Sequence, residues 1–276
     1  FKYVRSQRND AHIDIGGPMD LSSLFDLTGR TAIVTGGSRG IGRMISEGLL
    51  SAGATVYITA RKAEACDATA EELSEFGTCI SLPCDLSDPE SLMTFVRQFS
   101  DRETSLDILV NNAGAAWRAP FDEFPEHGWD KVMDLNLKAP FFLTQQLTPM
   151  LTKAHVTNGH QAKVINIASI DGLSLNPMET FSYHASKAGM IHLTRRMAVT
   201  LAPRGIVVSA IAPGAFATKM NREAAEKADE VVQGIPAGRI GVDADMGAAA
   251  VYLASNAGDY VVGETLVVDG GVTIQR

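Results

Sequence analysis

Short apolar runs alternate with longer amphipathic stretches along the chain from residue 31 onward. The apolar runs are rich in Val, Ile and Leu, which is typical of strands buried on both faces. They predict seven strands, over residues 31–35, 55–59, 79–83, 106–110, 163–168, 206–211 and 265–269. Between the strands, apolar side chains recur at helical spacing. The predicted helices are one that ends at Gly53, one over 63–76, one capped by Asp88, and others over 127–151, 181–202 and 243–255.

This alternation predicts an α/β fold with a parallel sheet covered by helices on both faces. No linker interrupts it, so residues 21–276 are expected to form a single Rossmann-type, doubly wound domain around a central seven-stranded sheet. Residues 1–20 are aperiodic and are expected to be a flexible extension, with Met19 as a candidate natural start. Residues 215–240 are polar and contain Gly and Pro, and we expect a mobile helical lid there.

Composition narrows the classes of function. The formal net charge of −8 disfavours nucleic acid as a partner, because nucleic-acid binding usually requires a basic surface. No apolar run reaches the roughly 18 residues that span a bilayer, and no signal-peptide pattern opens the chain. The three cysteines, Cys66, Cys79 and Cys84, are odd in number and lack metal-ligand spacing. We therefore expect a cytoplasmic protein with reduced, structural thiols and no metal site.

One glycine-rich turn joins the first predicted strand to the helix after it. It reads Thr35-Gly36-Gly37-Ser38-Arg39-Gly40-Ile41-Gly42. Glycine allows the backbone to approach a ligand closely, and the first turn of a helix presents free N–H groups to phosphate. The spacing is G-x-x-x-G-x-G rather than G-x-G-x-x-G, so a tight strand-to-helix connection is the alternative. The strand and helix around it favour a dinucleotide site.

Three further motifs follow in order: Asn111-Asn112-Ala113-Gly114, then Ser169 with Tyr183-His184-Ala185-Ser186-Lys187, then Pro213-Gly214. Each stands at the carboxyl end of a predicted strand or on the helix after it. Together with the glycine turn they resemble the short-chain dehydrogenase/reductase family, over about residues 26–273. Within that family the chain is most similar to the NADP-dependent β-ketoacyl reductases, including the rhamnolipid-type reductases.

The resemblance implies a catalytic tetrad of Asn136, Ser169, Tyr183 and Lys187. Tyr183 and Lys187 are four residues apart and lie on one face of a helix. A neighbouring ammonium is expected to lower the tyrosine pKa and favour proton transfer. A hydroxyl at Ser169 can polarise a substrate carbonyl. The family also places an asparagine at the position of Asn136, where it holds a water in a proton relay with the lysine; a solvated helical side chain is the alternative.

The residues after the second strand indicate which nicotinamide cofactor binds. An acidic residue there would hold the ribose 2′-OH of NAD, but the chain has Arg61 and Lys62 instead. Arg39 and Arg61 together can hold a 2′-phosphate, which predicts NADP(H). The family implies further cofactor contacts from turn residues and from other strand ends. The expected contacts are Gly36, Ser38, Gly40, Ile41, Gly42, Asp85, Leu86, Asn112, Ala113, Gly114, Tyr183, Lys187, Pro213, Gly214 and Thr218. Asn111 and Asn112 can instead serve to stabilise the central strands.

The substrate is predicted less sharply. A set of apolar side chains suggests a wall for an apolar ketone, with ordinary packing as the alternative. They are Trp117, Leu173, Leu175, Met178, Phe181, Phe216, Met220 and Ile235. A basic patch for an acyl carrier protein is a further hypothesis, with a solvated face as its alternative; it comprises Arg118, Lys131, Arg195 and Arg196.

The expected reaction is NADPH-dependent reduction of a ketone, such as a 3-oxoacyl thioester on acyl carrier protein or coenzyme A. The alternatives are an alcohol, polyol or steroid dehydrogenase of the same family, and a non-catalytic NADP-binding sensor or scaffold. The family also implies a homo-oligomer, either a dimer or a tetramer, assembled through the long helices and the last strand.

Overall fold

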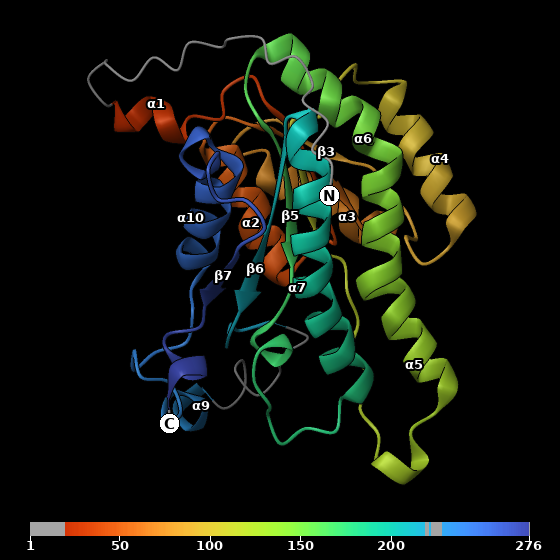
Figure 1. Ribbon diagram of the computed structural model, residues 1–276, viewed down its shortest axis with the longest axis vertical. Coiled ribbons are helices and arrows are strands. Elements are labelled where there is room, and N and C mark those ends of the chain that lie inside the picture. The colour runs from red at the N-terminus through yellow and green to blue at the C-terminus, as the bar shows by residue number, and fades with distance from the viewer. Residues whose placement is uncertain (1–19, 219–220, 222–227, 276) are drawn as a thin grey trace, which may run out of the picture.

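The computed structural model describes residues 20–218, 221 and 228–275, so the predicted extension, apart from Asp20, lies outside the described residues. All seven predicted strands form, and they pair in parallel in one sheet of order β3-β2-β1-β4-β5-β6-β7 (Figure 1). The strands are β1 (Thr31–Thr35), β2 (Thr55–Thr59), β3 (Cys79–Ser81), β4 (Ile108–Asn111), β5 (Ala162–Ile167), β6 (Ile206–Pro213) and β7 (Thr265–Val268). The predicted ranges of β1 and β2 match the structure, and the other strand ends differ by at most two residues, as expected for boundaries read from sequence.

Helices connect the strands. The α-helices are α1 (Leu21–Phe25), α2 (Gly40–Ser51), α3 (Ala63–Leu73), α4 (Pro89–Ser100), α5 (Glu126–Met133), α6 (Ala139–Asn158), α7 (Phe181–Leu201), α9 (Ala228–Val232) and α10 (Asp243–Ala254). Short 3₁₀ turns are η1 (Phe121–Glu123), η3 (Ile170–Gly172), η4 (Ala202–Arg204), η5 (Asn256–Gly258) and η6 (Val272–Ile274). The Asp88 carboxylate accepts a hydrogen bond from Ser91 N–H at 3.0 Å, which confirms it as the cap of α4.

The helices form two layers, one on each face of the sheet (Figure 1). One apolar core lies between the sheet and α2, α3 and α10, and a second lies between the sheet and α4, α6 and α7. The central strands β4, β5 and β6 are buried throughout, because they have helices on both faces. This single parallel sheet, covered by helices on both faces, confirms the predicted fold class.

The strand order reverses between β1 and β4. From β1 the chain moves to β2 and β3 on one side, and β4 then pairs with the other side of β1. Ligands of doubly wound sheets bind at the carboxyl ends of the strands where this reversal occurs. The glycine turn after β1 and the Asn111–Gly114 motif at the end of β4 therefore lie at the expected ligand-binding edge.

The sequence predicted one continuous helix over residues 127–151, but the structure interrupts it. A π-helical turn, η2 (Asp134–Lys138), separates α5 from α6, and the Ala139 N–H bonds to the Asp134 carbonyl five residues back. Pro140 has no N–H, so it cannot donate the α-helical hydrogen bond to the Asn136 carbonyl. Asn136 is one of the residues of this π-helical turn, and its side chain is buried. Such π turns are frequent at functional sites.

Candidate active site

Ser169 follows β5 directly and begins the turn η3. Its hydroxyl oxygen accepts a hydrogen bond from the Asp171 N–H at 3.1 Å, so the side chain caps this turn. The Ser169 side chain also hydrogen-bonds to the side chain of Tyr183, which lies near the start of α7. The predicted serine and tyrosine, fourteen residues apart in sequence, are thus brought into direct contact.

Lys187 lies one helical turn after Tyr183. Its Nζ is 5.5 Å from the centroid of the Tyr183 ring and donates a 2.7 Å hydrogen bond to the Ile167 carbonyl at the end of β5. Only 5% of the lysine surface is exposed. Lys187 therefore fastens α7 to the strand that leads into Ser169.

The pKa values of this pair differ from the sequence-based expectation. Burial raises the pKa of Tyr183 to about 12; the Ser169 hydrogen bond lowers it and the Asp171 charge raises it. Burial lowers the pKa of Lys187 to about 8, while Asp171 raises it. The predicted lowering of the tyrosine pKa by the ammonium was wrong, because loss of hydration disfavours the phenolate more than its neighbours favour it.

Asn136 is held by backbone groups of the loop after β4. Its Oδ1 accepts from Ala115 N–H at 2.8 Å, and its Nδ2 donates to the Ala115 carbonyl at 2.9 Å. The same Nδ2 donates to the Ser186 hydroxyl at 3.1 Å, and Ser186 in turn donates to the Tyr183 carbonyl at 2.8 Å. The solvated alternative for Asn136 is therefore wrong. Ser186, which links Asn136 to the tyrosine backbone, was given no role from sequence, although its three-residue spacing from Tyr183 is a readable signal.

The glycine turn has the close backbone contacts that its sequence predicts. Gly36 has a φ of +65°, and a Cβ on Gly42 would lie 2.3 Å from the Gly36 carbonyl oxygen. The turn ends at the first residue of α2, whose N-cap, Arg39, makes no side-chain capping bond. The Arg39 side chain therefore does not occupy the first N–H groups of α2, which suit an anion such as a pyrophosphate group. Ser38, half-buried, belongs to the same turn.

The asparagines after β4 have structural partners. Asn111 Nδ2 donates to Asn166 Oδ1 and Thr144 Oγ1, joining β4, β5 and α6. Asn112 Nδ2 donates to the Thr35 carbonyl at 2.7 Å and so fixes the glycine turn. Their side chains therefore support the alternative of strand stabilisation. Ala113 lies against Gly36, and Gly114 lies against Asn136, so both line the edge of the candidate site.

The predicted NADP-selecting arginines both lie at this edge of the sheet. Arg39 is exposed in the glycine turn, and Arg61 is exposed two residues after β2. β1 and β2 are paired neighbours, which places the two guanidinium groups on adjacent loops. Asp85 Oδ1 accepts from the Ser87 N–H and hydroxyl, whereas Leu86 is buried in the core. The structure therefore gives Leu86 a packing role.

The segment after β6 reaches back to the glycine turn. A Cβ on Gly40 would lie 3.3 Å from the Thr218 side chain, so Thr218 stands beside the start of α2. Pro213 is the last residue of β6, and Gly214 packs directly against Asp269 after β7. The predicted lid falls partly on residues 219–220 and 222–227, which lie outside the described residues; the rest includes α9.

The predicted apolar wall is only partly available to a substrate. Phe216 and Ile235 are 2% and 6% exposed, so for these two the packing alternative holds. The Trp117 ring packs edge-on against His127. Leu173, Leu175 and Met178 remain exposed, and Met220 lies outside the described residues. Phe181 helps to line a cavity of about 310 Å³, together with Phe121, Phe124, Pro125, Glu126 and Trp129.

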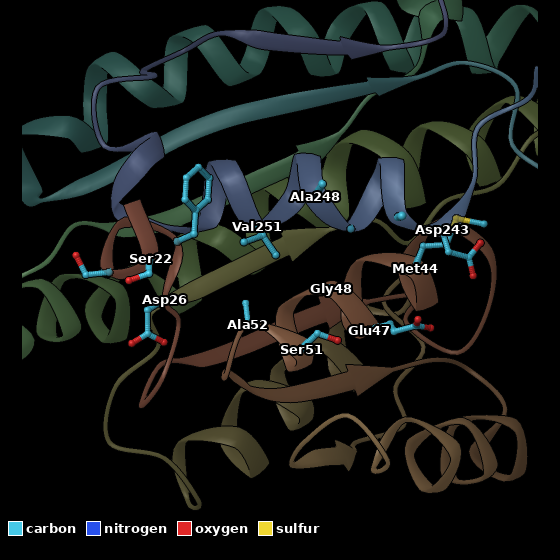
Figure 2. Close-up of a pocket in the computed structure, with 14 residues that line it drawn as sticks. Ser22, Asp26, Met44, Glu47, Gly48, Ser51, Ala52, Asp243, Ala248 and Val251 are labelled. Atoms are coloured by element: carbon cyan, nitrogen blue, oxygen red, sulfur yellow. The ribbon is translucent and has the colours of Figure 1, made fainter. Parts of the chain in front are cut away.

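A larger groove, of about 810 Å³, lies elsewhere (Figure 2). Its walls come from α1, α2 and α10, with Met44 and Gly48 facing Ala248 and Val251. No predicted site residue lines it. This groove is therefore separate from the predicted catalytic residues.

Three further features of the described part of the chain bear on function. No helix there is long and apolar enough to cross a membrane. Its side chains form no cluster of three or more His, Cys, Asp or Glu residues suited to a metal ion. All three cysteines are free thiols, and burial raises the pKa of each.

Known proteins share this architecture and sequence. A family model described as enoyl-(acyl carrier protein) reductase matches residues 36–273. A rhamnolipid-biosynthesis 3-oxoacyl-[acyl-carrier-protein] reductase of Pseudomonas aeruginosa is 44% identical, over 90% of this chain and 97% of its own. A 2-dehydro-3-deoxy-D-gluconate 5-dehydrogenase of Bacillus subtilis is 38% identical, over 91% and 97%. The solved RhlG/NADP active-site complex of Pseudomonas aeruginosa has a TM-score of 0.87 and 42% identity, with 91% and 99% covered.

The family model spans residues 36–273, and the structure brings together the motifs on which the resemblance rests. On both grounds, the chain belongs to the short-chain dehydrogenase/reductase family of oxidoreductases.

Proposed function

We propose that this protein is an NADPH-dependent carbonyl reductase that acts on a 3-oxoacyl thioester or another apolar ketone. The contact between Ser169 and a Tyr183 whose phenol stays protonated carries the proposal. Reduction of a ketone requires a proton donor beside the carbonyl oxygen, and a neutral phenol is such a donor.

The residues of the candidate site suit a dinucleotide. The uncapped start of α2 and the glycine turn would hold the pyrophosphate. Arg39 and Arg61 would hold a 2′-phosphate, which favours NADPH over NADH. The nicotinamide, when bound, supplies the hydride. The relative crystallised with NADP supports this choice.

The chain's own residues then handle the oxygen and its proton. The Ser169 hydroxyl and the Tyr183 phenol lie beside each other, so Ser169 would donate a hydrogen bond to the substrate oxygen and Tyr183 would transfer its proton to it. Lys187, buried beside the ring, stabilises the phenolate that remains. Asn136, which Ala115 and Ser186 fix in position, would hold a relay water between Lys187 and solvent.

A sugar-acid dehydrogenase is the second candidate function, because relatives of that class are also similar to the chain. A non-catalytic NADP sensor is disfavoured by the intact tetrad. The acyl-carrier hypothesis has weaker support. Lys131 lies over the Trp117 ring, 5.3 Å from its centroid. Arg118 precedes Ala119, whose N–H bonds to the Glu179 carbonyl just before α7, whereas Arg195 and Arg196 lie toward the other end of that helix. Exposed apolar side chains on α6, including Phe141 and Phe142, support the proposed homo-oligomer.

Oxidation of NADPH at 340 nm, followed with a panel of carbonyl compounds, tests this function. The panel should contain acetoacetyl-coenzyme A, ethyl acetoacetate and a 5-keto sugar acid. We expect turnover of the first two and a kcat/KM for NADPH at least about tenfold above that for NADH, as one lost bidentate ion pair is worth more than about 1.4 kcal/mol. Preference for NADH, or turnover of the sugar acid alone, would refute the proposal.

A further inference from the structure

We propose that Asp171 is a specificity-determining residue whose carboxylate disfavours substrates that carry a negative charge near the reacting carbonyl. The inference rests on the proposed function. It narrows the substrates to neutral ketones, esters and thioesters, as opposed to keto acids.

Asp171 is fixed on the same turn as Ser169. Its N–H donates to the Ser169 hydroxyl at 3.1 Å. The next residue, Gly172, packs against α7 so closely that a Cβ there would lie 2.7 Å from the Lys187 carbonyl carbon. This close contact holds the turn against the helix that carries Tyr183 and Lys187.

The carboxylate itself is also held in place. Asn176 Nδ2 donates to Asp171 Oδ1 at 2.8 Å, and the aspartate is half-buried. Its charge raises the pKa of both Tyr183 and Lys187, which places it within electrostatic reach of the reacting groups. A half-buried charge is only partly screened by solvent.

The surrounding segment offers little to an anion. Between Ser169 and Tyr183 the chain carries two carboxylates, Asp171 and Glu179, and no Lys or Arg. The exposed Leu173 and Leu175 are apolar. The Lys187 ammonium is the opposing charge, and Asp171 offsets it. Loss of the Asp171 charge would leave this ammonium uncompensated, and a negatively charged substrate would then gain most.

Acetoacetate and its ethyl ester test the inference, because they share the reacting 3-oxo group and differ in charge. We expect the wild-type protein to prefer the ester. In Asp171→Asn the ratio of kcat/KM for acetoacetate to that for the ester should rise about tenfold, the order of one charge–charge interaction at partly screened range. Asp171→Glu, which keeps the charge, should keep the ratio low.

Asp67→Asn, an exposed change on α3 that alters the net charge equally, serves as the matched control and should leave the ratio unchanged. Salt offers a test that needs no variant, since added salt should raise wild-type kcat/KM for acetoacetate more than for the ester. An unchanged ratio in Asp171→Asn, or an equal loss with both substrates, would overturn the role of Asp171; so would a wild-type ratio that is insensitive to salt. Failure of the wild type to reduce even the ester would instead reject the proposed function and this inference together.

Discussion

Tyr183 keeps its proton through the physiological pH range because burial raises its pKa to about 12. This favours the reductive direction, in which the phenol donates, over alcohol oxidation, in which a phenolate must accept. The Ser169 hydrogen bond and the nearby Lys187 are then most valuable after transfer, when the negative charge has formed. The family resemblance implied a catalytic role for these three residues, but the expected direction of the tyrosine pKa shift was wrong, since burial is a property of the folded chain.

Replacement of the tyrosine hydroxyl tests this role. In Tyr183→Phe, kcat for ketone reduction should fall at least about a hundredfold, the lower range for loss of a general acid. The affinity for NADPH, measured by fluorescence titration, should stay within about threefold, because the phenylalanine ring fills the same space beside Lys187. A variant that binds NADPH normally and turns over at a near-wild-type rate would show that Tyr183 is not the proton donor.

At the scale of elements, the sequence predicted what depends on local pattern. The strands, the glycine turn and the helix that carries Tyr183 and Lys187 all follow from periodicity and spacing. The π turn at Asn136 was not predicted, although Pro140, which has no N–H to donate to the Asn136 carbonyl, was a local signal for it. The partners of the Asn136 side chain could not be predicted, because the two backbone groups of Ala115 come from another loop. For the same reason Phe216 was predicted at the substrate wall, although it packs against Gly241 in the folded chain.

The glycine turn supplies the prediction for this scale. In Gly42→Ala the added methyl would meet the Gly36 carbonyl oxygen, so the turn must open or α2 must shift. We expect a loss of about 1–3 kcal/mol in the free energy of unfolding, typical of overpacking, and at least about a tenfold loss in NADPH affinity. Denaturant unfolding and calorimetric titration measure the two quantities. Gly234→Ala, which meets only the Val231 carbonyl at 3.6 Å, is the control; normal NADPH affinity in Gly42→Ala would contradict the assignment of the turn.

At the scale of the whole molecule, buried charged groups lie at both ends of the parallel strands. At the amino ends, Arg30 donates to the Ala254 carbonyl and to Asn256, while Asp107 accepts from Thr31 and Asn158. The Arg30 bonds join residues from opposite ends of the chain, so the fold itself supplies hydrogen-bond partners for this buried charge. At the carboxyl ends, Lys187 donates a hydrogen bond to the Ile167 carbonyl, and the burial of the lysine costs stability.

The lowered pKa of the buried Lys187 makes the stability of the whole protein depend on pH. The pKa of Lys187 is about 8 in the folded protein, against an ordinary value of 10.5. Between these values the unfolded chain binds more protons than the folded one, so this residue makes the free energy of unfolding rise with pH, and below pH 8 its contribution is flat. Relative to Lys187→Met, which does not titrate, the nucleotide-free wild type should gain about 2 kcal/mol between pH 7 and 9.5. Tyr183 is present in both proteins and stays protonated over that range in the folded wild type, so it contributes little to the difference. Chemical denaturation of both proteins at matched pH measures the difference, and parallel stability curves would mean that Lys187 keeps its ordinary pKa in the folded state.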